Sequence, residues 1–464
     1  MLYLLLSRTG GIKPPAKTRP SPHGHKIAIR NPLLTSEGRG LVRCRGFYTP
    51  GTSLGHWFYT PGTSHCRGFH TPGIRPALLL LFLALCLACG GRNAFAAPAS
   101  LPVTVLLPSK RPSGFPVNDQ IRVTFYPAQN AASPRAPAIV LLHPIGESEG
   151  GLLARFMDKL AAQMAAQGMG CALMSLPYHL GRTVGKTNSA SHFIGPRVAD
   201  VTQAFGQSAS DVSTVADWLQ TRPDTDPQRL GVMGISLGAV IAHLAMGQDA
   251  RLNAGVALEG GGDLPSLYAG SAEVALYGHF LPELLTPEAR ARLSLVDPAH
   301  YTQFNRPRHV LMIEAARDLY VPPRNAEYLW NALGRPHIVW TDTNHFSFLL
   351  AGKSLSRTSS AYLQRVWAGH ADDPAPLPHY FVPTIKAGWL LELNGNSAPM
   401  IALQAYSLAS YHNHLSALHL DIGETGRGPY VGLATSLTPY IDAGMEHRFF
   451  GTSVQPYVSL HIAF

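Results

Sequence analysis

The stretch Leu230-Gly231-Val232-Met233-Gly234-Ile235-Ser236-Leu237-Gly238-Ala239 decides the fold of the central part of the chain. A short apolar run ends in a Gly-x-Ser-x-Gly pentapeptide, and a helix of small residues is expected from Leu237 to Met246. A serine hydroxyl is a weak nucleophile, so it must stand exposed on a sharp turn beside a base. Such a turn tolerates only small residues two positions away, here Gly234 and Gly238. The pattern predicts that Ser236 is a nucleophile; the alternative is a tight turn with a capping serine.

Strand and helix patterns alternate from Ala97 to about Trp367. Several of the strands are continuous apolar runs, which is typical of strands buried on both faces. The alternation predicts an α/β domain with a mostly parallel sheet, helices on both faces and an active site at the carboxyl ends of the strands. The expected strands are Val103–Leu107, Ile121–Tyr126, Ala138–Leu142, Cys171–Leu176, Leu230–Met233, Ala254–Leu258, Val310–Ile313 and His337–Thr341, and the clearest helices are Leu152–Gln167 and Val198–Thr221.

Two polar residues follow the ends of later strands. Asp318 comes after Val310–Ile313, and His345 comes after His337–Thr341. The order Ser236, Asp318, His345 resembles the catalytic triad of the α/β-hydrolase superfamily, and the resemblance covers about Pro102 to Trp367. It implies that His345 is the general base and that Asp318 orients it. Glu259, just past the preceding strand, is an alternative acid, and Asp342 is a further rival.

The resemblance also implies two backbone donors for an oxyanion. The first is the N–H of Leu237, at the start of the helix that follows the nucleophile. The second is expected in the turn His143-Pro144-Ile145-Gly146, which is similar to the family's His-Gly-x loop with proline in place of glycine. Because proline has no N–H, the donor expected there is Ile145, with Gly146 next.

Two segments are expected to shape a substrate pocket. The first runs from Leu176 to Arg197, and the second, from Leu264 to Leu295, carries Tyr268, Tyr277, Phe280 and Leu281. An apolar and aromatic rim suits a lipid-like or other small ester, although such residues also serve plain packing. The individual pocket candidates are His143, Tyr178 and Arg182. An alternative for His143 is a packed residue that shapes its loop, and whether Arg182 or Arg197 binds an anionic group stays open.

No metal or cofactor is expected. The chain has 21 histidines, but no His-Glu-x-x-His, paired-cysteine or phosphate-loop spacing. The net charge of +9 comes from residues 1–96, which hold 12 Lys and Arg and one acidic residue, leaving 25 basic and 27 acidic residues after them. We therefore expect no nucleic-acid partner.

The first 96 residues resemble a leader followed by an export signal. Residues 1–74 are expected to be a disordered upstream segment, with a start assigned too far upstream. Residues 75–96 have the layout of a signal peptide: Arg75, an apolar run and a small-x-small site before Ala97. A lipoprotein acylated on Cys89 is the alternative. Cys171 is the one cysteine after residue 96, so no internal disulfide is expected there.

After a Pro-rich linker at 371–384, helix patterns end. Five strands are expected within an antiparallel β domain at 385–464: Trp389–Leu393, Met400–Tyr411, Leu415–Ile422, Tyr430–Tyr440 and Gln455–Phe464. The alternating last strand with its terminal Phe resembles bacterial outer-membrane barrel proteins. Because five strands are too few for such a barrel, a compact sheet with one buried face is predicted. The alternative is a piece of an oligomeric or degenerate barrel.

These patterns predict an exported serine hydrolase that cleaves carboxylic esters through an acyl-enzyme on Ser236. The central region loosely resembles the dienelactone-hydrolase branch, whose usual nucleophile is cysteine, so a serine favours ordinary ester hydrolysis. The expected location is the periplasm, the outer membrane or envelope, or the medium, with envelope association through the C-terminal β domain. The alternatives are a peptidase or thioesterase of the same fold, and an envelope-anchored binding or structural protein with an inactive hydrolase fold.

Overall fold

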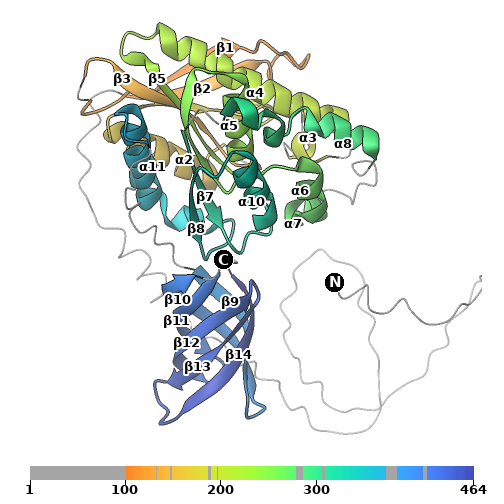
Figure 1. Cartoon of the computed structure of the whole chain (residues 1–464), viewed down its shortest axis with the longest axis vertical. Coiled ribbons are helices and arrows are strands. Elements are labelled where there is room, and N and C mark those ends of the chain that lie inside the picture. The colour runs from red at the N-terminus through yellow and green to blue at the C-terminus, as the bar shows by residue number, and fades with distance from the viewer. Residues whose placement is uncertain are drawn as a thin grey trace, which may run out of the picture. The chain divides into compact units, whose positions relative to one another are not determined.

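The computed structural model describes residues 101–463, apart from 132, 147–148, 186–189, 196, 278–285, 306–308, 372–383 and 411–414. The expected leader (1–74), the expected signal peptide (75–96), Phe464 and nearly all of the linker at 371–384 lie outside the described residues. The described residues form a helix-covered sheet and, after it in the chain, a β-barrel (Figure 1).

An eight-stranded sheet is the centre of the first part, in the order β1-β2-β4-β3-β5-β6-β7-β8. β1 pairs antiparallel with β2, β2 pairs antiparallel with β4, and every later pair is parallel. The α/β-hydrolase fold predicted from the sequence is therefore confirmed. The strands are β1 Val103–Pro108, β2 Gln120–Tyr126, β3 Ala136–Leu142, β4 Gly170–Met174, β5 Thr225–Ile235, β6 Leu252–Leu258, β7 His309–Ala315 and β8 His337–Thr341.

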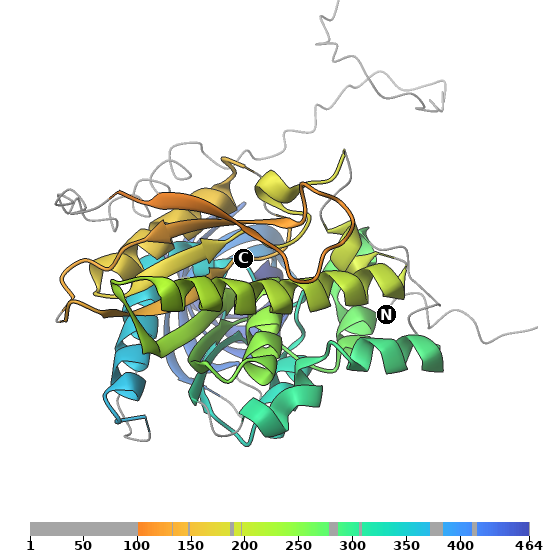
Figure 2. The ribbon, with the colours of Figure 1, turned by 90° about the horizontal axis from the view of Figure 1, so that it is seen from above.

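Helices cover both faces of this sheet (Figure 1; from above in Figure 2). Successive residues of a strand point to opposite faces, so β3 divides its apolar side chains between two cores. Val140 and Leu142 pack with α4 (Val198–Thr221) and α5 (Leu237–Gln248). Ile139 and Leu141 pack in the other core, with α2 and α11. The remaining elements are α2 Leu152–Ala166, η1 Leu180–Arg182, α3 Ser191–Ile194, α6 Leu264–Gly270, α7 Ala272–Tyr277, α8 Pro287–Ser294, η3 Pro298–Tyr301, α9 Thr302–Asn305, α10 Pro323–Ala332, η4 Ser347–Leu350 and α11 Gly352–Trp367.

Among the described helices, none combines the length and the hydropathy needed to cross a membrane.

The C-terminal part is an antiparallel β domain, as predicted, and it is closed into a barrel. Six strands pair each with the next, and β14 pairs with β9 to close a barrel. The prediction of five strands is wrong, and a closed barrel is nearer to the alternative of a degenerate barrel than to a simple compact sheet. The strands are β9 Thr384–Glu392, β10 Ser397–Ser410, β11 Ser416–Thr425, β12 Gly428–Thr438, β13 Ile441–Arg448 and β14 Val454–Ala463.

The strand missing from the prediction is β13. It follows β12 after only two residues, and it carries Asp442, Glu446, His447 and Arg448, so it lacks the apolar alternation by which a strand is found. Asp442 and Glu446 are both buried. Because the inward face of this barrel is polar, β13 carries charged residues where a strand pattern would have apolar ones. The strand is therefore not detected by its pattern, although the barrel needs it for closure.

Candidate active site

The turn between β5 and α5 presents Ser236. Its backbone has φ 55° and ψ −117°, a conformation that non-glycine residues rarely adopt. A Cβ on Gly234 would lie 2.0 Å from the carbonyl oxygen of Gly238, and a Cβ on Gly238 would lie 2.5 Å from that of Leu142. Both positions therefore exclude any side chain, which is the reason for the Gly-x-Ser-x-Gly pattern. The serine hydroxyl stands at the carboxyl end of a central strand.

The structure brings Ser236, His345 and Asp318 together from three loops. The Oγ of Ser236 lies 2.8 Å from Nε2 of His345, and Nδ1 of His345 lies 2.7 Å from Oδ2 of Asp318. The other carboxylate oxygen of Asp318 accepts the N–H groups of Tyr320 and Val321, each at 2.8 Å. These two bonds fix the carboxylate, which in turn holds the proton of the imidazole on Nδ1 and leaves Nε2 free to accept the serine proton.

Glu259, the alternative acid, also reaches this histidine. Its Oε2 lies 3.4 Å from Nδ1 of His345, farther than the carboxylate of Asp318. Burial first, and then the negative charge of Asp318, raise the pKa of Glu259 well above its ordinary value. A neutral carboxyl group stabilises an imidazolium less than a carboxylate does. Asp318 is thus the better-placed acid, and the other rival, Asp342, is paired with Arg317 at 2.6 Å.

Both expected oxyanion donors belong to residues that line the pocket around Ser236. Leu237 begins α5, so its N–H belongs to the open first turn of a helix. The N–H of Gly146 donates to Nε2 of His179 at 3.2 Å and is therefore engaged. In the part of the chain that the structure describes, no acceptor binds the N–H of Ile145. The geometry leaves Leu237 and Ile145 as the two available donors.

A pocket of about 450 Å³, including its open mouth, adjoins the serine hydroxyl. Short helices α3, α6 and α7 supply much of its wall, and the hydroxyl of Tyr268 on α6 donates to the carbonyl of Phe193 on α3. Apart from two serines, the wall is formed by apolar and aromatic residues: Ile145, Phe193, Ile194, Phe205, Leu237, Val240, Leu264, Leu267, Tyr268, Val274, Tyr320 and Val321. The pocket fits an uncharged, apolar group next to the nucleophile.

The three individual pocket candidates lie elsewhere. Arg182 is fully buried and forms an ion pair of 2.7 Å with Asp211, which rules it out as a free anion ligand. Tyr178 stacks on His192 with ring centroids 3.7 Å apart. His143 donates from Nδ1 to the carbonyl of Pro144 and accepts the N–H of Leu176 at Nε2, so it shapes the loop that carries Ile145.

The two segments expected to shape the pocket do contribute to it, and Tyr268, one of the residues named for the second segment, lines it. Phe193 and Ile194 come from the first segment, and Leu264 to Val274 come from the second. Tyr277 belongs to α7, but its side chain, like Phe280 and Leu281, lies outside the described part of the structure. Tyr320 and Val321 also line the pocket and were not among the sequence candidates, although they lie two and three residues after Asp318. Their proximity to the acid was the available signal.

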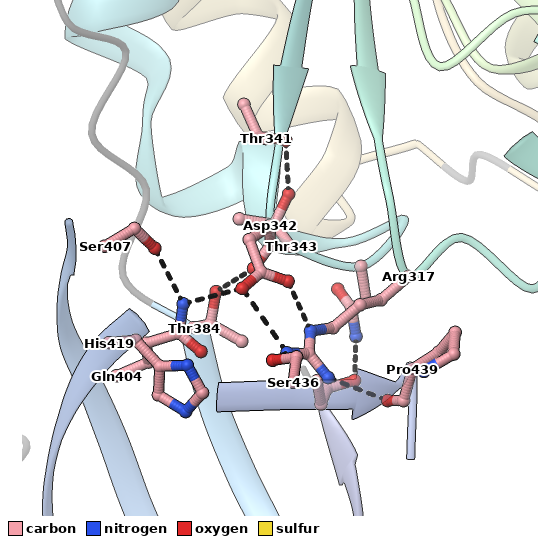
Figure 3. Close-up of polar contacts among 12 residues, drawn as sticks. Arg317, Thr341, Asp342, Thr343, Thr384, Gln404, Ser407, His419, Ser436 and Pro439 are labelled. Atoms are coloured by element: carbon pink, nitrogen blue, oxygen red, sulfur yellow. Dashed lines mark hydrogen bonds and ion pairs between the residues drawn. The ribbon is translucent and has the colours of Figure 1, made fainter. Parts of the chain in front are cut away.

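The barrel contacts the two loops that carry the acid and the base (Figure 3). Arg317, next to Asp318, donates to Ser436 at 2.6 Å and to the carbonyl of Pro439 at 2.8 Å. Asn344, next to His345, donates to the carbonyl of Ala463 in the last strand. Sequence patterns gave no sign of these contacts, since they join segments more than 100 residues apart.

Two clusters of histidine and carboxylate have spacings compatible with a metal ion. One consists of Glu259, Asp318 and His345, whose Nδ1 already donates to Asp318. The other consists of His419, Asp421 and Asp442 inside the barrel. There the ammonium group of Lys386 lies 2.8 Å from His419 and 2.6 Å from Asp442, so the chain itself supplies the cation.

Part of the chain is similar to known proteins. Residues 202–349 match the model of the prolyl oligopeptidase family. A search of curated proteins finds no match. Similar solved structures include a Pyrococcus horikoshii acylaminoacyl peptidase (16% identity, TM-score 0.43, 57% of this chain and 41% of that one) and a puromycin-hydrolyzing peptidase of Mycobacterium tuberculosis (17%, 0.45, 58% and 40%). A Pyrococcus furiosus esterase shares 16% identity, with a TM-score of 0.41 over 59% of this chain and 96% of its own. The chain thus spans about two fifths of the two peptidases.

Proposed function

We propose, from the premise that this chain carries a serine hydrolase domain of the α/β-hydrolase superfamily, that the protein cleaves carboxylic esters through an acyl-enzyme. The observation that carries this proposal is the Ser236–His345–Asp318 relay opening directly into an apolar pocket. A relay of this kind is built for acyl transfer, and the pocket accommodates the acyl group next to the attacking oxygen.

The reaction follows from the positions of these groups. Nε2 of His345 removes the proton of Ser236 as the hydroxyl oxygen attacks the ester carbonyl. The resulting oxyanion accepts hydrogen bonds from the N–H groups of Leu237 and Ile145. His345 returns the proton to the departing alcohol, which leaves the acyl group on the serine. Water then attacks this acyl-enzyme with His345 as base, and the carboxylic acid leaves.

The lining of the pocket supports an uncharged, apolar substrate. Among the described residues of its wall, none carries a charged side chain. Burial of each substrate methylene there is worth about 0.8 kcal/mol, or roughly a fourfold gain in binding. We infer that esters with longer aliphatic acyl chains are preferred over acetyl esters and over esters of charged acids.

A second candidate activity is peptide hydrolysis, which the match to the prolyl oligopeptidase family favours. The same relay cleaves amides when a site holds the peptide backbone by polar contacts. Against this candidate, the only polar side chains in the described pocket wall are those of Ser236, Ser271, Tyr268 and Tyr320. Ester hydrolysis is therefore the primary proposal.

Export to the cell envelope remains a proposal supported by sequence alone. The apolar run that follows Arg75, with Ala94-Phe95-Ala96 before Ala97, supports secretion. The absence of cysteine pairs after residue 96 is compatible with an oxidising compartment.

A fluorophosphonate probe tests the nucleophile directly. We expect it to label the wild-type chain and not Ser236→Ala, and we expect p-nitrophenyl butyrate and octanoate to be turned over only by the wild type. Aminoacyl and Z-Gly-Pro p-nitroanilides, assayed in parallel, measure the peptidase alternative. Absence of both labelling and turnover would support an inactive fold; cleavage of anilides in preference to esters would support a peptidase.

A further inference from the structure

The barrel has a charged interior. Lys386 is fully buried, and its ammonium group donates to His419 at 2.8 Å, to Asp421 at 3.0 Å and to Asp442 at 2.6 Å. All three hydrogens of the ammonium thus have partners within the barrel. Further buried polar side chains on the inward face are Gln404, Thr425, Ser436, Glu446, Ser459 and His461. The interior is held together by polar contacts, and its apolar cluster is small.

The outer face of the same strands is apolar. Each strand alternates, so the residues between the inward polar ones point outward. Every strand contributes at least one large, exposed apolar side chain, among them Leu433 (45% exposed), Met445 (46%) and Ile462 (54%). We call this surface the outer belt and define it as Trp389, Tyr406, Ile422, Leu433, Leu437, Met445, Leu460 and Ile462.

This arrangement is the reverse of a barrel that folds in water, where apolar residues fill the interior. Polar-in, apolar-out alternation is the pattern of barrels in lipid. Closure matters as well, because lipid cannot satisfy the unpaired N–H and C=O groups of a sheet edge. Here β14 pairs with β9, so the six strands leave no open edge.

We propose that the outer belt contacts lipid acyl chains and that the barrel anchors the hydrolase in a membrane. The strands contain between 8 and 14 residues, and about 9–11 residues suffice for a tilted strand to cross a bilayer. With six strands the barrel is narrower than the usual minimum of about eight for outer-membrane barrels. Its interior is filled by side chains such as Lys386, Tyr430 and Tyr457, which suits an anchor and excludes a pore.

The position of the outer belt on all six strands favours lipid over a second copy of the chain. A two-fold interface covers one side of a barrel, whereas a bilayer surrounds it. Two outward polar residues lie at the end away from Arg317, where Glu424 and His447 follow Ile422 and Met445 along their strands.

Vesicle flotation tests the anchor. The full chain is mixed with vesicles of equal parts phosphatidylethanolamine and phosphatidylglycerol and centrifuged through a density gradient. We expect the wild type to float and a Leu433→Glu/Leu460→Glu variant to lose at least tenfold of the floated fraction. A matched control, Leu106→Glu on the exposed face of β1 (61% exposed), should float like the wild type. All three proteins keep the apolar run of residues 77–88, so that run cannot explain a difference.

A second measurement covers the case in which the charged variant does not fold. Vesicles of brominated phosphatidylcholine quench tryptophans that lie within the acyl region. We expect quenching of the wild type and its loss in Trp389→Phe. Wild type that stays with the soluble fraction, a charged variant that folds and still floats, or quenching unaffected by Trp389→Phe would each overturn the proposal. Light scattering that shows dimers dissociated by the charged variant, without flotation, would overturn it in favour of self-association.

Ester turnover in the same fractions keeps this proposal separate from the proposed function. If the protein is active but does not float, only the proposal of a membrane anchor is contradicted. If the protein floats but is inactive, only the proposal of an esterase is contradicted.

Discussion

Arg317 and Ser436 join the loop of the catalytic acid to the barrel: the guanidinium Nη2 donates to the serine Oγ at 2.6 Å (Figure 3). The same guanidinium is paired with Asp342 at 2.6 Å. The backbone N–H of Arg317 donates to the carbonyl of Thr343 at 2.9 Å. Because Arg317 precedes Asp318, and Thr343 lies two residues before His345, this one residue links both catalytic loops to each other and to the β domain.

We therefore expect Arg317→Ala to slow ester turnover at nearly unchanged KM. Loss of the guanidinium frees the acid loop and breaks the buried ion pair with Asp342, which costs about 3–5 kcal/mol of stability. A shift of the relay of even about 1 Å can cost up to a hundredfold in rate. Steady-state kinetics at a temperature where the variant is folded, with thermal unfolding measured alongside, would check this.

Asn344→Ala is the companion variant beside the catalytic base. It removes the hydrogen bond to Ala463 and the two that Oδ1 accepts from Phe346 and Ser347. It should lower kcat by a few-fold while costing about 1 kcal/mol of stability for each hydrogen bond lost. Exposed Arg335→Ala serves as the control and should change neither quantity. Unchanged kcat in both Arg317→Ala and Asn344→Ala would show that the contacts hold the domains together without positioning the relay.

Asp318 and Glu259 should differ sharply on substitution. Asp318→Asn is expected to reduce kcat by about 10⁴-fold, because an amide imposes the wrong imidazole tautomer. Glu259→Gln should keep kcat within about threefold, since its side chain lies 3.4 Å from Nδ1 and a raised pKa keeps it neutral. Kinetics on p-nitrophenyl butyrate would check both variants, and the reverse ranking would make Glu259 the acid.

Glu259→Gln should also change the pH dependence of stability. Burial and the charge of Asp318 raise the pKa of Glu259 in the folded state above its value in the unfolded chain. Ionisation is therefore easier in the unfolded chain, so the glutamate costs stability once the pH exceeds about 4.5, and increasingly so up to its folded pKa. The variant should be more stable than the wild type at pH 8, and the difference should vanish near pH 4. Urea titrations at both pH values measure it; a difference independent of pH would contradict the raised pKa.

His243, on α5 behind the nucleophile, should make the wild type acid-labile. Burial lowers its pKa to about 4, and both ring nitrogens lack a hydrogen-bond partner among the described residues. The neutral ring is thus favoured in the folded state, and the associated stability is lost as the pH falls from about 6.5 through 4. The loss amounts to about 3 kcal/mol, and His243→Leu should remove it. The exposed His300→Ala variant is the control, and an equal acid loss in His243→Leu and wild type would refute the assignment.

The sequence and the structure agree best where local pattern and tertiary environment coincide. The strands of the central sheet are apolar runs because helices cover both faces, so Ala138–Leu142 and Ala254–Leu258 could be placed from composition. Ser236, Asp318 and His345 could be placed because strand ends in a parallel sheet meet at one edge. The same reasoning did not find β13 of the barrel, since the polar interior gives this strand the composition of a charged loop.

Contacts between segments that are distant in the sequence could also not be predicted from local sequence patterns. Arg182 looks like an anion ligand in sequence, whereas its carboxylate partner, Asp211, lies 29 residues later on α4. The pocket wall depends in the same way on how α3 and α6 approach Ser236, which no periodicity encodes.

Chain-length preference should depend on Leu267, which lines the pocket on α6 and is almost fully buried. A tryptophan there would fill space next to Ser236. If it displaces two substrate methylenes, octanoate loses about 1.6 kcal/mol of binding, so kcat/KM for octanoate relative to acetate should fall about tenfold. The exposed Leu295→Trp adds the same ring away from the pocket and should leave the ratio unchanged. Equal losses for both esters would mean that the acyl group binds elsewhere, and an unchanged ratio in Leu267→Trp would remove the pocket from the proposed mechanism.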